Sequence, residues 1–148
     1  DDYFEIRLDY GWLKVVLKSG MLVREMGPRY MIHGTVGSFI KYGEDPQEDR
    51  LKAGESPVGD HWCFEPEENH GLLHTEIDGQ IVREKYPSLR GNFGWFYENI
   101  YAAIREGKPL QEKPEHGYNV IRMIEHAFQS CEIQCAVECT GLLNATYR

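Results

Sequence analysis

The chain contains the segment Gly34–Gly54, GTVGSFIKYGEDPQEDRLKAG, in which glycines and a proline constrain the path of the backbone. Gly34 and Gly37 bracket a tight reversal between two apolar runs, Tyr30–His33 and Phe39–Tyr42, and the second strand is expected over Ser38–Tyr42. Glycine adopts the unusual backbone conformations that such a reversal needs. The segment therefore predicts two neighbouring strands joined by a short turn.

A short helix is expected directly after these strands. Asp45 is a favourable N-cap residue, Pro46 suits the first helical position, and Glu48 can reach back to complete a capping box. Gly54 then provides a helix stop. We predict a helix over Pro46–Ala53, with Asp45 in a structural role as its N-cap.

On the amino-terminal side, apolar and polar side chains alternate over Tyr3–Tyr10, which is typical of a half-buried strand. Gly11 leads into a second alternating run, Leu13–Ser19, so the two runs predict a hairpin. Met21–Glu25 is a further short apolar run, consistent with a third strand or a sheet edge.

On the carboxyl-terminal side, residues 55–69 are polar and rich in proline, glycine and acids, which predicts a long loop. Two further strands, Leu72–Ile77 and Gln80–Lys85, are expected to form a hairpin because Asp78-Gly79 lies between them.

From Asn92 the apolar spacing changes to three and four residues, which predicts a helix that ends at Gly107. A second helix is expected from Pro114 to about Cys135. The last run, Ala136–Leu143, is consistent with a closing strand.

Together these elements predict an α+β fold, a largely antiparallel or mixed β-sheet with helices packed on one face. The length of 148 residues suits a single domain, residues 1–148. The other sheet face carries Val16 among lysines, with Tyr3 and Met31 elsewhere, and is compatible with solvent or a partner subunit.

Composition narrows the classes of partner. The formal net charge of -8 argues against nucleic acid and anionic membrane surfaces, which need a basic face. No apolar run approaches membrane-spanning length. We expect the four cysteines to be reduced thiols of a cytoplasmic protein, with Cys131 and Cys135 buried on the second helix and Cys63 and Cys139 elsewhere.

The string Gly-Thr-x-Gly-Ser-Phe-x-Lys-Tyr-Gly-x-Asp-Pro-Gln-Glu, residues 34–48, occurs with Asp2-Tyr3-Phe4 upstream and residues 65–87 downstream. On these motifs the chain resembles the C-terminal domain of the Gfo/Idh/MocA oxidoreductases, from Asp1 to about Leu143. The resemblance implies a fold like the C-terminal domains of glyceraldehyde-3-phosphate-dehydrogenase-like and dihydrodipicolinate-reductase-like oxidoreductases.

Members of that family also carry an N-terminal nucleotide-binding Rossmann domain and a Glu-Lys-Pro catalytic segment. The nucleotide-binding domain has no counterpart in these residues. Glu112-Lys113-Pro114 spells the tripeptide, but it lies between two predicted helices, so we treat it as a coincidence.

The resemblance further implies hydride transfer between NAD or NADP and a CH–OH group of a sugar, polyol or cyclitol such as inositol. The N-terminal domain of the same polypeptide would hold the cofactor. The present domain would line the substrate cleft and form a homo-oligomer through its open sheet face. The chain has no glycine-rich nucleotide cradle, so we expect this fragment alone to bind no cofactor and to be inactive.

The alternative is a non-catalytic binding or dimerisation module with the same fold, because a fold does not determine a function. A glycine-rich βαβ unit ahead of Asp1 would favour the enzyme, and its absence would favour the module.

Four side chains on or beside the central strands are candidates for substrate contact, namely His33, Lys41, Tyr42 and Gln47. They offer hydrogen-bonding groups that suit a substrate rich in hydroxyls. We expect Gln47, on the first turn of its helix, to face outward. No catalytic residue is predicted in this chain.

His61, Cys63, His70 and His74 are residue types that bind zinc. Their spacing matches no recognised metal-binding pattern. We therefore predict ordinary loop and strand residues and no metal site, with zinc binding as the alternative that metal analysis would test.

Overall fold

The computed structural model describes residues 2–143 and divides into two compact units. One unit comprises the chain up to Val23 together with the part from Ala102 onward, and the other comprises Arg24–Tyr101. None of the helices described in either unit is long and apolar enough to cross a lipid bilayer.

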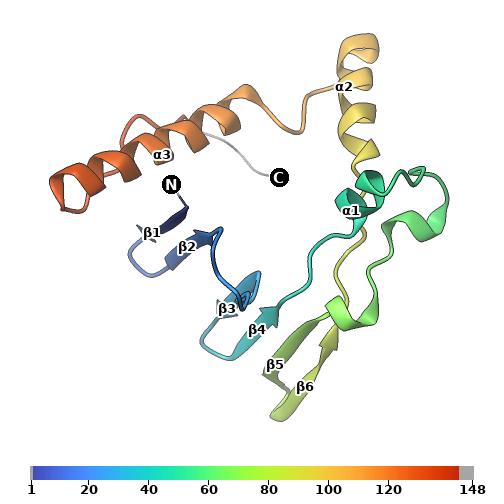
Figure 1. Ribbon diagram of the computed structural model, residues 1–148, viewed down its shortest axis with the longest axis horizontal. Coiled ribbons are helices and arrows are strands. Elements are labelled where there is room, and N and C mark those ends of the chain that lie inside the picture. Colours follow the sequence, from blue (N-terminus) through green and yellow to red (C-terminus); the bar gives the residue numbers. More distant parts are fainter. Residues whose placement is uncertain (1, 144–148) are drawn as a thin grey trace. The chain divides into compact units, whose positions relative to one another are not determined.

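A four-stranded antiparallel sheet occupies the Arg24–Tyr101 unit (Figure 1). Its strands, in spatial order, are β3 (Tyr30–His33), β4 (Gly37–Lys41), β5 (Gly71–Ile77) and β6 (Gln80–Tyr86). The turn between the first two strands is closed by the Gly34 N–H, which donates to the Gly37 carbonyl at 2.8 Å. The antiparallel pairing predicted around this reversal is confirmed.

The β5–β6 hairpin turns through Asp78 and Gly79, as its sequence predicts. Their φ angles are 51° and 76°, so both residues lie in the left-handed region. That geometry belongs to a type I′ turn, whose twist matches the flanking strands. An aspartate followed by glycine is among the few pairs that adopt it at low cost.

Gly71 allows close packing inside this sheet. A Cβ placed on Gly71 would lie 2.1 Å from Cζ of Phe39, so the phenyl ring of Phe39 lies directly against the Gly71 backbone. Phe39 and Leu73 are register partners on β4 and β5. The absence of a side chain at Gly71 therefore provides the space that the ring of Phe39 occupies.

The short helix α1 (Gln47–Lys52) follows β4. The helical path ends at Gly54, which adopts φ +81°. The Gly54 N–H donates to the Leu51 carbonyl at 3.0 Å. Glu48 does not act in a capping box. Its carboxylate instead pairs with Lys52 at 2.7 Å, one helical turn further along.

The long polar segment contains two 3-10 turns, η1 (Asp60–Cys63) and η2 (Glu67–Asn69). After β6 comes α2 (Gly94–Glu106), which continues into the other unit. The Asn92 side-chain oxygen accepts the Gly94 N–H at 2.8 Å, and Gly107 adopts φ +68° just past the last turn. The start and stop predicted for this helix are confirmed within two residues.

The unit that begins the chain contains the hairpin β1 (Tyr3–Asp9) and β2 (Lys14–Gly20), which forms a sheet of its own. The predicted strands thus form two sheets. The third strand considered at Met21–Glu25 is absent, because the chain turns at this point. The Met21 N–H donates a hydrogen bond to the Asp2 carbonyl at 2.8 Å, and the backbone then leaves the hairpin.

Helix α3 (Pro114–Ile133) ends where Gln134 adopts a left-handed conformation, φ 55°. The closing strand predicted over residues 136–143 is wrong, because this segment is irregular. A side chain of α3 holds it instead. Asn119 donates to the Leu143 carbonyl at 2.8 Å and accepts the Leu143 N–H at 2.8 Å.

The predicted burial of Cys131 and Cys135 is also wrong, since both are exposed. Apolar side chains at helical spacing before them on α3 are exposed as well, by 56% at Ile121 and 58% at Phe128. Apart from α3, the described part of this unit contributes a two-stranded sheet, the end of α2 and an irregular tail. These elements leave the apolar face of the 20-residue helix uncovered.

Candidate functional site

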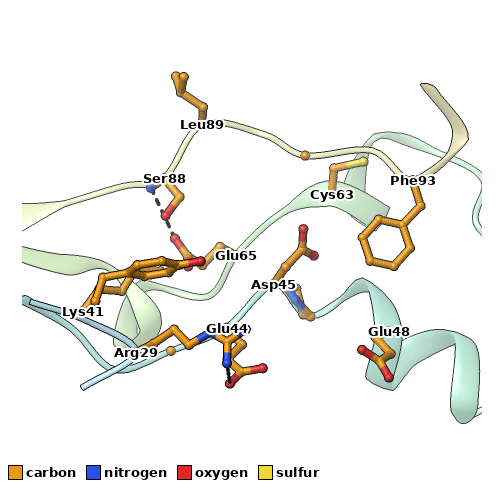
Figure 2. A pocket seen from close by; sticks show the side chains of 14 residues that line it. Arg29, Lys41, Glu44, Asp45, Glu48, Cys63, Glu65, Ser88, Leu89 and Phe93 are labelled. Atoms are coloured by element: carbon orange, nitrogen blue, oxygen red, sulfur yellow. Dashed lines mark hydrogen bonds and ion pairs between the residues drawn. The ribbon is translucent and has the colours of Figure 1, made fainter. Parts of the chain in front are cut away.

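A cavity of about 350 Å³ lies within the Arg24–Tyr101 unit (Figure 2). Its lining comes from the start of β3, the end of β4, the turn into α1, the loop around η1 and the segment after β6. The motif that begins at Gly34 thus supplies one side of the cavity. The long loop and the chain after β6 supply the rest.

Lys41 ends β4 at the edge of this cavity and is buried, with 7% of its surface exposed. Its Nζ donates to the Asn69 carbonyl at 2.6 Å and forms an ion pair with Glu65. A buried ammonium group needs such partners, because desolvation of an unpaired charge is costly. Within residues 2–143 these contacts use two of its three N–H donors.

Glu65 is the acidic partner, and its side chain is 11% exposed. Burial raises the pKa of its carboxyl group, but hydrogen bonds from Lys41 and from Ser88 outweigh burial, so the pKa lies below its ordinary value of 4.5. The Ser88 backbone N–H donates to Oε2 at 3.2 Å. Glu65 is therefore a carboxylate at neutral pH, connected through both oxygens to β4 and to the segment after β6.

Gln47 does not face outward as expected, because it is 0% exposed. Its Oε1 accepts the indole N–H of Trp62 at 3.2 Å and the backbone N–H of Phe93 at 3.0 Å. Its Nε2 donates to both carboxylate oxygens of Asp45, at 3.1 and 2.8 Å. Gln47 therefore joins α1 to η1 and to the residue before α2 through hydrogen bonds at both polar atoms of its amide.

Asp45 presents its carboxylate at the cavity, in the space framed by Glu65 and Phe93 in Figure 2. The helix begins one residue later than predicted, with Pro46 in the N-cap position, yet Asp45 Oδ1 still accepts the Gln47 N–H at 3.0 Å. The described residues form no ion pair with this carboxylate.

Gly91 approaches Asp45 closely from the segment after β6. A Cβ at Gly91 would lie 2.9 Å from Asp45 Oδ2 and 3.3 Å from Gln47 Nε2. Asp45 is an exposed residue, but its carboxylate has the Gln47 amide on one side and the Gly91 backbone on another. These neighbours limit its orientations.

The charged side chains of the lining are predominantly acidic. They are the carboxylates of Glu44, Asp45, Glu48 and Glu65 and the cations of Arg29 and Lys41. Each of the two cations has an acidic partner, since Arg29 pairs with Glu44 at 3.3 Å and Lys41 with Glu65. The cavity therefore offers more negative than positive charge.

The structure brings together Lys41, Asp45 and Gln47 but not the other two candidates. His33 pairs with Ser38 at the opposite end of the β3–β4 ladder, and its Nδ1 lies 2.8 Å from Ser38 Oγ. Tyr42 is 67% exposed and is not among the side chains that line the cavity. It follows Lys41 directly, and successive residues of an extended chain point to opposite sides.

Sequence reasoning missed Glu65, Ser88, Trp62 and Gly91. Glu65 and Lys41 are 24 positions apart, so no local sequence pattern indicates that they form an ion pair. The one available signal was indirect, because Glu65 opens the second run of residues that resembles the oxidoreductase family.

The histidine and cysteine group of the long loop does not converge. Among the described residues, no three side chains of the ligand types histidine, cysteine, aspartate and glutamate could hold a metal ion. Cys63 lines the cavity, whereas His74 lies on β5 opposite Ser38.

The described residues do not fit a dinucleotide site of the βαβ type. Such a site needs parallel strands joined through a glycine-rich turn to a helix. Every strand pair within residues 2–143 is antiparallel, and the chain has no Gly-x-Gly-x-x-Gly string.

Comparison with known proteins supports a specific family. Residues 1–138 match the domain described as "Oxidoreductase family, C-terminal alpha/beta domain", GFO_IDH_MocA_C. The chain is 46% identical over 129 residues to scyllo-inositol 2-dehydrogenase (NADP(+)) IolW of Bacillus subtilis, covering 87% of this chain and 36% of that protein. It is 36% identical over 130 residues to the uncharacterized oxidoreductase YhhX of Escherichia coli, with 87% and 37% covered.

Solved structures agree with this match. The structure of yvaA from Bacillus subtilis superposes with a TM-score of 0.86 at 44% identity, covering 90% of this chain and 40% of that one. An oxidoreductase from Bacillus cereus superposes with a TM-score of 0.79 at 36% identity, with 87% and 38% covered. The chain thus spans well under half the length of these relatives, and it belongs to the Gfo/Idh/MocA oxidoreductase family, whose C-terminal α/β domain it matches.

Proposed function

We propose that this chain is the substrate-binding and oligomerisation domain of an NAD- or NADP-dependent oxidoreductase. The parent enzyme would transfer a hydride between the cofactor and a CH–OH carbon of a sugar, polyol or cyclitol. The observation that carries this proposal is the 46% identity to a protein named scyllo-inositol 2-dehydrogenase (NADP(+)). Because the chain spans 36% of that relative, cofactor binding is assigned to the N-terminal domain of the same polypeptide.

In this proposal the present domain forms one wall of the substrate cleft. It supplies none of the groups that exchange protons with the substrate. Lys41 is the wall residue with the strongest support, since it is buried and borders the cavity. His33 and Tyr42 remain predicted substrate contacts outside that cavity. Gln47 supports the wall from within, because its polar atoms are already bonded to protein groups.

The proposal includes a homo-oligomer that associates through one face of the β3–β6 sheet. The register places Met31 in the same face as Ile40 and Leu72, and the same face continues to Ile81. Met31 is 59% exposed and Ile81 76% exposed. Apolar surface of this kind on a sheet face suits a partner subunit. A cytoplasmic location is also proposed, since the four free cysteines suit a reducing compartment.

The test of this function uses the full polypeptide that contains the chain. Purified protein is incubated with NADP+ or NAD+ and a panel of sugars, polyols and scyllo-inositol, and formation of the reduced nicotinamide is followed by its absorbance. Reduction with at least one of these substrates supports the proposal. Failure with the whole panel, from folded protein that binds NADPH, would overturn it.

A second experiment separates the roles of the two domains. NADH and NADPH are titrated into this chain alone by calorimetry, after circular dichroism has verified that the sample is folded. No heat with either nucleotide supports the assignment of the cofactor to the other domain. Saturable binding would contradict that assignment and favour a cofactor site in these residues.

A further inference from the structure

We propose that the cavity bordered by Lys41, Asp45 and Glu65 is a binding site for a neutral, polyhydroxylated ring, and that Gln47 is a positioning residue for Asp45. This inference rests on the proposed function, because it places that function's substrate class at a defined site. It assigns Asp45 a ligand-binding role in addition to its bond to the start of α1.

The first argument is the pairing of an available donor with an available acceptor. Lys41 lines the cavity and is buried, and within the described residues one of its three N–H donors has no protein acceptor. Asp45 lines the same cavity, and among residues 2–143 its carboxylate is hydrogen-bonded to groups of Gln47 alone. A hydroxyl both donates and accepts, so two hydroxyls of one ring can satisfy both groups.

The second argument is charge. Anionic ligands are disfavoured, because the lining holds four carboxylates and both of its cations already have acidic partners. A cationic group has no lone pair to accept the Lys41 N–H that the described residues leave without an acceptor, so it would satisfy Asp45 alone. A neutral ligand that needs one cationic donor and one anionic acceptor meets both conditions.

The third argument is size and surface. A cavity of about 350 Å³ lies near the lower end of the range of ~300–1,000 Å³ typical of small-molecule sites. Phe93 contributes an apolar ring on the Asp45 side of the cavity, whereas the Leu89 side chain, 96% exposed, points away from the other lining residues in Figure 2. A polyhydroxylated ring has C–H faces that pack on an aromatic side chain while its hydroxyls meet the polar groups.

The role of Gln47 follows from its geometry. Its Nε2 donates to both oxygens of Asp45, while its Oε1 is fixed by Trp62 and Phe93. The carboxylate of Asp45 is therefore held by an amide that cannot itself turn. Gln47 is 0% exposed, so it acts on a ligand only through Asp45.

The experiment titrates scyllo-inositol into the full polypeptide by calorimetry, with and without NADPH. The probe variant is Asp45→Asn, and the matched control is Asp49→Asn, which makes the same change at an exposed position of α1 outside the cavity. We expect Asp45→Asn to weaken binding roughly ten-fold or more, since a hydrogen bond to a charged group is lost. Asp49→Asn should leave the affinity within about two-fold. The anionic probe myo-inositol 1-phosphate should bind more weakly than scyllo-inositol.

A double variant covers the case in which Asp45→Asn does not fold. Asp45→Asn with Gln47→Glu exchanges the amide and the carboxylate, so their mutual hydrogen bond is retained and the thermal midpoint should recover. The proposal requires that scyllo-inositol binding stays weak, because position 45 no longer presents a carboxylate. Recovery of binding together with folding would show a merely structural role and overturn the proposal.

These outcomes separate the site from the function. If the parent enzyme oxidises scyllo-inositol but Asp45→Asn binds it as tightly as the unaltered protein, the site is wrong and the function stands. If scyllo-inositol binds in an Asp45-dependent manner but no polyol is oxidised, the site stands and the proposed function fails. No binding of scyllo-inositol, with either form of the protein, overturns the site.

Discussion

The indole N–H of Trp62 donates to Oε1 of Gln47 at 3.2 Å, and the two side chains are 2% and 0% exposed. Trp62 is the buried hydrophobic residue of the described chain, and Gln47 is its polar partner. The best protected contact in the Arg24–Tyr101 unit is therefore a hydrogen-bonded pair and not an aliphatic cluster. That pair also determines the position of Asp45.

Replacing Gln47 with alanine should destabilise the protein strongly. The substitution leaves the indole N–H of Trp62 and the backbone N–H of Phe93 without an acceptor. Each unsatisfied buried donor costs about 1–3 kcal/mol, so we expect the two together to lower the free energy of unfolding by about 2–6 kcal/mol. Urea denaturation measures it. The control is Gln80→Ala at an exposed position of β6, where a change above about 1 kcal/mol would count against this reasoning.

Gly71→Ala should also be costly, because the new Cβ would lie 2.1 Å from Cζ of Phe39. The ring has to move or the strands have to separate, and overpacking of this kind typically costs about 1–3 kcal/mol. Thermal or urea denaturation gives the value.

Gly27→Ala is the matched control for that experiment, since nothing lies within 4 Å of a Cβ at Gly27 and its φ is not in the left-handed region. We expect a change of less than about 1 kcal/mol, with stabilisation possible through reduced entropy of the unfolded chain. A Gly71→Ala variant as stable as Gly27→Ala would contradict the close contact with Phe39.

The hairpin turn provides a third prediction. Gly79→Val places a β-branched residue at φ 76°, which should destabilise the protein by roughly 1–2 kcal/mol. Asp78→Asn, at the preceding residue, should be nearly neutral because asparagine tolerates the left-handed region. Comparison of the two variants by urea denaturation separates backbone strain from a general effect of changing the turn.

The fourth prediction concerns pH. The pKa of Glu65 is lowered in the folded state, so its pairing stabilises the fold above the unfolded pKa of about 4.5 and this stabilisation is lost as pH falls through the folded pKa. Below pH 4.5 the stability of the unaltered protein should therefore fall more steeply than that of Glu65→Gln. Urea denaturation between neutral and acidic pH measures both slopes.

Glu48→Gln is the control for the pH experiment. The pKa of Glu48 is also lowered, by its hydrogen bond to Lys52, but this pair is exposed. Solvent and salt screen such a pair, so its removal should change the slope less than removal of Glu65. If the free energy of unfolding of the two variants depended equally on pH, the burial of Glu65 would not increase its contribution to the pH dependence of stability.

Much of the secondary structure follows from local rules. The turn residues Asp78 and Gly79, the cap Asn92 and the stop Gly107 all act over a few positions, and the structure confirms the elements that they delimit. The failures share another cause. The buried cysteines and the closing strand were inferred from apolar runs alone, and an apolar run does not specify what covers it.

Part of the candidate site was also accessible from sequence. Lys41 was predicted to bear a functional group on a central strand, and it lines the cavity. Gln47 was assigned to the right turn of helix but to the wrong side of it. The position of a residue in a helix determines the direction in which its side chain leaves the backbone. The hydrogen bonds from Trp62 and Phe93 determine where the amide of Gln47 lies.

Local sequence was sufficient for the α+β composition, the main strand pairs and the family resemblance, because propensities, turns and motifs operate between near neighbours. Tertiary structure alone determined the cavity. Its lining pairs Lys41 with Glu65, 24 residues apart. The Gln47 amide, which holds Asp45 from behind the lining, accepts the backbone N–H of Phe93, 46 residues away. Desolvated polar groups need partners wherever the fold places them, and that requirement specifies pairs which no sequence spacing reveals.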